Sequence, residues 1–189
     1  MGGLTDVACV SGNQGGVMSA TREDCATHPN RAPELLFRVR GIDRADFAQW
    51  RSLWQQYLRP TTQERSPPAF YLQPPPGKVA DATFERLVDP ARQPHALVAV
   101  NGDRLIGFAH YLFHPSTWSL TQLCYLEDLF VEPAMRRAGV GSALIRGLYA
   151  AANQANACAV YWLTHESNIA ARPLFETLAR PTGFIRYER

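Results

Sequence analysis

Apolar residues in the early part of the chain recur at helical spacing. Between Arg44 and Leu58 they return every three or four residues, which is typical of an amphipathic helix. These positions are Phe47, Trp50, Leu53, Trp54, Tyr57 and Leu58. Pro60 lies just beyond them, as expected after a helix end. The pattern predicts a helix over residues 44–58, preceded by a short strand over residues 35–39.

The middle of the chain has the pattern of strands. Apolar runs at residues 96–100 and 105–113 flank the turn Asn101-Gly102-Asp103, and Asn-Gly between apolar runs is a strong signal for a hairpin. After a further loop, a third β-rich run covers residues 123–131. A short helix is predicted over residues 82–88, before the hairpin begins.

The late part of the chain alternates between the two periods. Residues 139–157 place Val140, Leu144, Leu148, Ala151 and Ala155 along one helical stripe. The remaining predictions are a strand over 159–164, a helix over 168–178 and a closing strand over 184–187. Antiparallel strands followed by alternating strands and helices predict a mixed α/β fold. Its central sheet is largely antiparallel, with helices on both faces.

Two segments do not have the composition of a packed core. Residues 1–34 contain no aromatic residue and carry five glycines, which predicts a flexible N-terminal extension. Residues 60–78 are rich in proline and predict a long loop or an extended spacer. With 189 residues in all, the chain is expected to hold one folded domain over residues 35–189.

Composition and charge narrow the class of protein. A hydrophobic fraction of 46% suits a globular protein, and a net charge of +2 gives no reason to expect nucleic acid or an anionic membrane as partner. No apolar run approaches the ~20 residues of a membrane helix, and no secretory signal is visible. The four cysteines, Cys9, Cys25, Cys124 and Cys158, form no regular framework, which predicts a reducing, cytoplasmic setting.

The loop before residue 140 has the features of a phosphate-binding site. Gly139 and Gly141 stand where a strand has ended and a long helix begins, and the first amides of a helix have no partner within it. Glycines let a pyrophosphate approach those amides, and Arg136 and Arg137 add positive charge. The dinucleotide motif Gly-x-Gly-x-x-Gly is excluded because position 144 is Leu, and no P-loop Gly-Lys-Ser/Thr is present.

The same loop carries a resemblance to a known family. The spacing Arg136-x-x-Gly139-x-Gly141, preceded by Leu129-Phe130-Val131 and Pro133, resembles the acyl-CoA signature of the GNAT superfamily of N-acetyltransferases. Further matches are Ile106-Gly107-Phe108-Ala109, the run from Tyr125 to Val131, and Asn168 before Phe175, and they most resemble spermidine/spermine N-acetyltransferases. The resemblance covers residues 37–189.

The resemblance implies acetyl-CoA as co-substrate, no metal, a small-molecule amine as acceptor and a homodimer. In that family the strand matching 123–131 splays from the strand matching 159–164, and the pantetheine arm lies in the gap. Leu129 and Val131 would bind the arm through their backbone, with Asn168 further along and Phe175 beside it. The pyrophosphate contacts would come from Arg136, Arg137, Ala138, Gly139, Val140, Gly141 and Ser142.

Acetyl transfer needs a neutral amine, yet an alkyl ammonium has a pKa of about 10.4, so fewer than roughly one molecule in a thousand is neutral at pH 7. We expect Glu127 to act as the base, through a water, and Asp128 to attract or orient a cationic substrate. Because strand residues alternate, only one of them should point into a given cleft. The alternative is that one is a solvated acid and the other the structural partner of an arginine. A backbone amide at Leu129 or Phe130 would polarise the thioester carbonyl.

One position departs from the family pattern. Relatives usually carry a tyrosine, the acid for the departing thiolate, where this chain has Phe175. Water, Tyr125, Tyr161 or Tyr187 would have to replace it. Three hypotheses therefore remain: an enzyme acting on a small amine, a protein or peptide lysine acetyltransferase, and a non-catalytic acyl-CoA sensor.

Several other side chains are expected to be ordinary structural residues rather than parts of a metal or catalytic site. His110 and His114 are four residues apart but on or beside a strand, so they predict no metal site. Trp50, Trp54 and Tyr57 are expected in the core, although helices at this place in the family border the substrate site.

Overall fold

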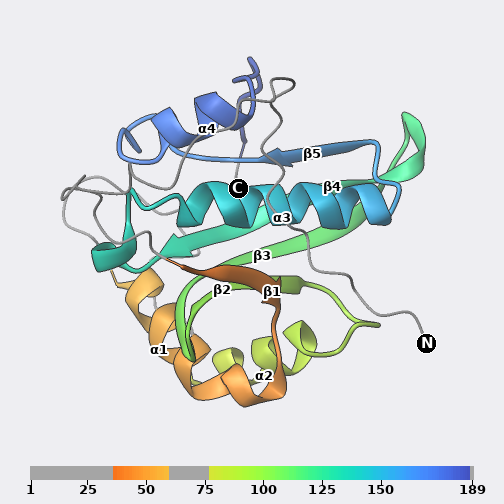
Figure 1. The fold of residues 1–189 in the computed structure, drawn as a ribbon. Coiled ribbons are helices and arrows are strands. Elements are labelled where there is room, and N and C mark those ends of the chain that lie inside the picture. Colours follow the sequence, from red (N-terminus) through yellow and green to blue (C-terminus); the bar gives the residue numbers. More distant parts are fainter. Residues whose placement is uncertain (1–35, 60–76, 188–189) are drawn as a thin grey trace, which may run out of the picture. The chain divides into compact units, whose positions relative to one another are not determined.

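The centre of the fold is a five-stranded sheet in the order β1-β2-β3-β4-β5 (Figure 1). Its strands are β1 (Arg38–Gly41), β2 (His95–Asn101), β3 (Arg104–Ser116), β4 (Ser119–Val131) and β5 (Ala159–Trp162). The pairs from β1 to β4 are antiparallel, and β5 runs parallel to β4. The predicted mixed, largely antiparallel sheet is confirmed.

This computed structural model describes residues 36–59 and 77–187, which all belong to one compact unit, Leu35–Arg189. The predicted extension over residues 1–34 lies outside the described residues, as does nearly all of the proline-rich segment 60–78. Both stay predictions.

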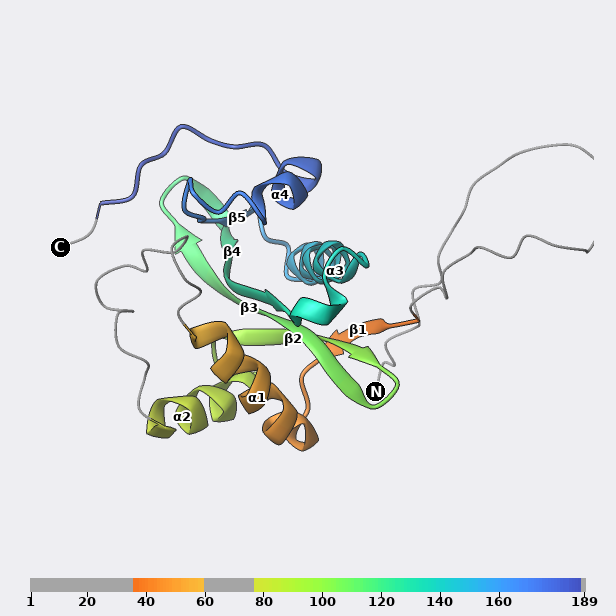
Figure 2. The same ribbon diagram turned by 90° about the vertical axis from the view of Figure 1, so that its left-hand side faces the viewer.

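Helices cover both faces of the sheet, as the sequence predicts. Figure 2 shows α1 (Phe47–Leu58) and α2 (Gly77–Leu87) on one face, and α3 (Val140–Gln154) and α4 (Arg172–Leu178) on the other. Short 3-10 turns, η1 (Arg44–Asp46) and η3 (Pro133–Met135), precede α1 and α3.

The alternation of side chains along each strand builds two cores. Val98 and Val100 of β2 join the core under α1 and α2, while Ala99 between them joins the core under α3. The largest side chain in the first core is Trp50, which is fully buried. The second core is lined by Leu144, Ile145 and Leu148 of α3.

Several boundaries differ from the predictions. The first strand begins at Arg38 rather than at residue 35. Its start is limited by its partner β2, because Arg38 pairs with Val100 and β2 ends one residue later, at Asn101. The loop predicted between 113 and 123 is largely strand, since β3 and β4 stay paired as far as Ser116 and Ser119.

The boundaries of other elements also differ from the predictions. α2 begins at Gly77, five residues before the prediction, and buries Ala80, Thr83, Phe84 and Leu87 on one face. The predicted closing strand over 184–187 is wrong: residues 180–187 have no regular structure, and Phe184, Ile185 and Tyr187 are exposed. Within the described part of the chain, no strand pairs with β5 beyond β4.

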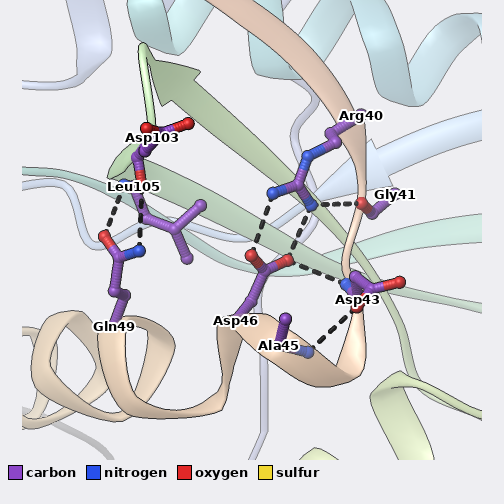
Figure 3. A network of polar contacts seen from close by, with 8 residues as sticks. All are labelled: Arg40, Gly41, Asp43, Ala45, Asp46, Gln49, Asp103 and Leu105. Carbon is purple, nitrogen blue, oxygen red and sulfur yellow. Dashed lines mark hydrogen bonds and ion pairs between the residues drawn. The ribbon is translucent and has the colours of Figure 1, made fainter.

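A polar network fixes the start of α1 against β1 (Figure 3). The Arg40 guanidinium donates to both oxygens of Asp46, at 2.6 and 2.9 Å. Asp46 also accepts from the backbone N–H of Asp43 at 2.8 Å, and the Asp43 carboxylate accepts from Ala45 N–H at 2.9 Å. This reciprocal capping box satisfies amides that the helix start would leave unpaired.

One turn later, Gln49 ties α1 to the β2–β3 turn. Its Nε2 donates to the carbonyl of Asp103, and its Oε1 accepts from the N–H of Leu105, both at 2.9 Å. Figure 3 shows the Gln49 side chain reaching from the helix to Asp103 and Leu105. The position of α1 across the sheet is therefore fixed at β1 and at the hairpin turn.

Two further observations bear on the setting of the protein. No helix among the described residues is long and apolar enough to cross a membrane. Cys124 is a buried free thiol and Cys158 an exposed one, whereas Cys9 and Cys25 lie outside the described residues. The cytoplasmic setting stays a prediction.

We expect Asp46→Asn to lower the free energy of unfolding by about 2 kcal/mol at pH 7. Losing one partner of a fully buried pair costs about 3–5 kcal/mol, and the partly exposed Arg40 reduces that cost. Burial alone would raise the pKa of Asp46, but hydrogen bonds from Arg40 and from the Asp43 backbone, with the Arg40 charge, hold it below its usual value.

Because the folded-state pKa is lowered, this stabilisation is present above the unfolded pKa of about 3.9 and is lost as pH falls through the folded one. Urea unfolding across pH measures it. The matched control is Glu85→Gln, which breaks the exposed pair with Arg44 and should cost under about 1 kcal/mol. Equal costs for the two variants would contradict the prediction.

Candidate active site

A β-bulge interrupts β4 at Glu127. Tyr111 pairs with Leu126 and His110 with Asp128, so Glu127 has no residue opposite it on β3. A bulge of this kind re-aims side chains and shifts the alternation of faces. Before it, Leu126 belongs to the α3 core, and after it Asp128 contacts the α1 side. The strict alternation assumed from the sequence does not hold here.

Asp128 is the centre of a chain of polar contacts on the α1 side. The hydroxyl of Tyr57, in the last turn of α1, donates to Asp128 Oδ1 at 2.7 Å. Nδ1 of His110 lies 3.0 Å from Asp128 Oδ2, and the indole N–H of Trp50 donates to His110 Nε2 at 2.9 Å. The described partners of Asp128 are thus a tyrosine and a histidine, not the arginine that the alternative interpretation supposed.

The Glu127 carboxyl combines solvent exposure with a raised pKa. The causes are partial burial and then repulsion by Asp128, opposed by His110 in its charged form and by the charge of Arg86. The groups acting on Glu127 come from β3, β4 and α2, on the same side of the sheet as α1.

The parallel pairing of β4 with β5 stops just before the bulge. It joins residues 123–126 of β4 to Ala159–Trp162, so among the described residues the later part of β4 has no strand on that side. The N–H of Glu132 donates to Ile106 on β3 at 3.0 Å. By alternation along the strand, the backbone groups of Leu129 and Val131 face away from β3, into the unpaired edge.

The start of α3 is open to an anion. Gly139 is the N-cap, with a φ of +82° that favours glycine, and no side chain of the described residues caps the helix. The first helical hydrogen bond runs from Ala143 N–H to Gly139 C=O at 3.0 Å, so the amides of Val140, Gly141 and Ser142 precede the helical ladder. This is the arrangement that binds phosphate at helix starts.

The basic residues of the loop are solvent-exposed. Arg136 and Arg137 lie between η3 and α3 with Ala138, and Arg137 has a φ of +62°. The Nε of Arg136 donates to the carbonyl of Val131 at 3.2 Å, which holds the loop against the end of β4. Gly141 has a packing role that the sequence did not indicate, because a Cβ there would lie 2.8 Å from Leu174 of α4.

Asn168 and Phe175 lie on the α3 side. The amide of Asn168 donates to Thr164 Oγ1 at 2.9 Å, and its backbone carbonyl accepts from the N–H groups of Ala171 and Arg172 at the start of α4. The ring of Phe175 packs on Trp162, with centroids 5.5 Å apart. Both residues border the β5–α4 connection rather than the acid pair.

Of the three tyrosines that the sequence offers in place of an acid at Phe175, Tyr125 lies nearest the acids in the chain. It is two residues before Glu127 on β4, half-buried, with its ring 5.0 Å from that of Tyr161. Burial and the nearby Glu127 raise its pKa, so its hydroxyl keeps its proton at neutral pH. Tyr161 contacts His114, and Tyr187 is exposed near the C-terminus.

The sequence analysis missed His110. It was expected to be ordinary, yet it is buried and lies between Trp50 and Asp128. Its only sequence signal is a histidine in an otherwise apolar strand, and its partner is revealed only by the register of β3 against β4. In the described ranges 36–59 and 77–187, no three His, Cys, Asp or Glu side chains gather as metal ligands.

Comparisons with known proteins match most of the chain to one family. Residues 47–179 match the profile described as the Acetyltransferase (GNAT) family. The D-amino-acid N-acetyltransferase HPA3 of Saccharomyces cerevisiae is 33% identical over 167 residues, which cover 85% of this chain and 97% of the yeast protein.

Solved structures share the fold at low sequence identity. One is AAC(6')-Iy in complex with a bisubstrate analogue of CoA, with a TM-score of 0.65 and 18% identity over 82% of this chain and 97% of that one. Another is a ribosomal-protein-alanine N-acetyltransferase from Brucella melitensis, with a TM-score of 0.62 and 18% identity over 82% and 98%. At this identity they support the fold alone.

Proposed function

Because this chain belongs to the acetyltransferase (GNAT) family, and is an N-acetyltransferase with acetyl-CoA as co-substrate, we propose that its acceptor is the primary amine of a small cationic or amino-acid-like molecule. The resemblance found in the sequence is thereby confirmed. An enzyme is favoured over a non-catalytic sensor, because the chain is 33% identical to a named N-acetyltransferase. The match covers 85% of this chain and 97% of that enzyme.

We propose that the open amides of Val140, Gly141 and Ser142 hold the pyrophosphate, with Arg136 and Arg137 adding charge. The backbone of Leu129 and Val131 borders the unpaired edge of β4, which suits the amide groups of the pantetheine arm. Such a site is made mostly of backbone, so it needs few particular side chains.

The observation that carries the proposed chemistry is Glu127 at the bulge, next to that edge. We propose that the amine nitrogen attacks the thioester carbonyl in a ternary complex while its proton passes, through water, to the Glu127 carboxylate. The carbon–sulfur bond breaks, and the thiolate takes a proton from water or from Tyr125. A raised pKa makes Glu127 a better proton acceptor than an ordinary glutamate.

Of the two substrate classes, Arg86 favours the amino-acid-like one. This half-buried arginine of α2 donates to Thr83 Oγ1 at 3.1 Å, and no carboxylate of the described residues forms an ion pair with it. Its charge acts on Glu127. An amino acid brings a carboxylate together with its amine, which would suit an arginine near a base. The yeast relative is named for D-amino acids.

Thiol release from acetyl-CoA, measured with D- and L-amino acids, polyamines and lysine peptides, tests the substrate class. We expect turnover with amino acids, and Arg86→Gln should raise their KM about tenfold or more through loss of a charged hydrogen bond. The KM for polyamines should not change, nor should either KM in Arg92→Gln, which removes an exposed arginine. Turnover with peptides alone would favour a lysine acetyltransferase instead.

The base is tested by Glu127→Gln. We expect kcat to fall about 10²–10⁴-fold while the affinity for CoA, measured by calorimetry, is unchanged. In the wild type, kcat/KM should rise with pH through the raised pKa of Glu127, because the carboxylate is the active form. That acid limb should disappear in the variant and persist in Glu176→Gln, which removes an exposed acid paired with Arg172. Unchanged turnover in Glu127→Gln would remove Glu127 from this role.

We also propose a homodimer. Trp118 and Leu120, at the tip of the β3–β4 hairpin, are almost fully exposed, as are Phe184 and Tyr187 near the C-terminus. Burying such side chains is favourable, and an edge strand such as β5 invites pairing. Sedimentation equilibrium should give twice the chain mass, and Trp118→Ser should weaken the association if the hairpin tip takes part. A monomer at every concentration would refute the proposal.

A further inference from the structure

The chain Trp50–His110–Asp128–Tyr57 has one arrangement of protons that satisfies every contact. An indole N–H only donates, so His110 Nε2 must accept from Trp50 at 2.9 Å. His110 is therefore neutral, with its proton on Nδ1, and that N–H donates to Asp128 Oδ2 at 3.0 Å. The Tyr57 hydroxyl donates to Asp128 Oδ1 at 2.7 Å. Asp128 accepts from both sides, as a carboxylate does.

The chain is enclosed by apolar and aromatic side chains. Trp50 is 0% and His110 1% exposed. The imidazole stacks on Phe108, with centroids 4.5 Å apart, and lies 5.2 Å from the ring of Trp54. A second proton on His110 would need a hydrogen-bond acceptor at Nε2, where Trp50 presents a donor instead. The contact with Trp50 is therefore made by the neutral imidazole, which does not cancel the charge of Asp128.

We propose that Trp50 and His110 are positioning residues that keep Asp128 permanently negative beside Glu127, and that this fixed charge sets the basicity of the site. The inference rests on the proposed role of Glu127 as base. A negative neighbour favours the protonated form of Glu127 and so strengthens it as a proton acceptor. With His110 as a cation, the pair would be neutral and Glu127 a weaker base.

The other ionisable groups facing Glu127 do not supply this charge. Tyr125 from β4 keeps its proton at pH 7, because burial and the nearby Glu127 raise its pKa. Arg86 from α2 is positive and acts in the opposite direction. Within residues 36–59 and 77–187, Asp128 is the one acid that acts on Glu127, so its charge contributes strongly to the local field.

Trp50→Phe removes the indole N–H and keeps an aromatic ring. Without that donor, Nε2 of His110 is free to take a second proton, and the carboxylate of Asp128 lies beside the resulting cation. We expect kcat/KM to match the wild type above about pH 8. At pH 6 it should fall about threefold to tenfold further than the wild type does.

The matched control is Trp54→Phe. Trp54 stacks against Trp50, with ring centroids 5.8 Å apart, and its buried indole N–H has no hydrogen-bond partner among the described residues. This variant removes a similar volume and an N–H but none of the hydrogen bonds of the chain, so any loss of kcat/KM should be the same at every pH. A pH-independent loss in Trp50→Phe as well would reduce Trp50 to packing and overturn the proposal.

A second measurement does not depend on activity. Nitrogen NMR of the full chain, with the His110 signals assigned by their absence in His110→Gln, reports the tautomer directly. We expect a neutral Nδ1–H imidazole from pH 5 to 8 in the wild type and protonation within that range in Trp50→Phe. Protonation of His110 within that range in the wild type, or an Nε2–H tautomer, would refute the inference.

The two proposals fail in different ways. If Glu127→Gln keeps full turnover, the proposed base is wrong, whatever the NMR shows. If the NMR prediction holds but Trp50→Phe and the wild type have the same pH profile, the chain fixes His110 without setting the basicity of the site, and only this inference fails.

Discussion

One extra residue in β4 determines how the site is built. Pairing with β3 fixes Leu126 opposite Tyr111 and Asp128 opposite His110, and Glu127 is left over between them. After this bulge the inward-facing set of β4 changes from the α3 face to the α1 face, which brings Asp128 against Tyr57 and His110. The parallel pairing with β5 ends at the same point, so an acidic pair and an unpaired strand edge occur side by side.

The acid pair also depends on contacts far from it. Trp50 and Tyr57 reach His110 and Asp128 only if α1 crosses the sheet at the right place. The contacts of Arg40 with Asp46 and of Gln49 with the β2–β3 turn fix that place at the other end of the helix. The helix between them is rigid because its inner face is closely packed under Trp50 and Leu53.

The two sides of the proposed site differ in whether backbone groups or side chains make the contacts. In the site that we propose, the cofactor side is backbone: helix amides at the start of α3 and strand groups at the end of β4. The acceptor side is made of side chains, namely Glu127, the Asp128 chain and Arg86. Backbone sites tolerate sequence change, whereas the acceptor side can vary with the substrate. Members of this family can therefore keep one co-substrate while their acceptors differ.

The sequence by itself determined the order of elements, the mixed sheet and the glycine loop. Those features depend on local properties: helical spacing in residues 44–58, the Asn101-Gly102 turn, and glycines at the start of a helix. The family followed from the same loop. The sequence alone also showed that position 175 is a phenylalanine, whose side chain has no acidic proton to give to the departing thiolate.

Tertiary structure decided the rest. Strand alternation predicted that Glu127 and Asp128 point to opposite faces, and only the register of β3 revealed the bulge that shifts them. His110 looked ordinary because its partners are 60 and 18 residues away in the chain. The apolar run at 184–187 predicted a strand, but a strand needs a neighbour, and within the described residues β5 offers none there. Register and long-range contacts are properties of the assembled fold, so no local pattern encodes them.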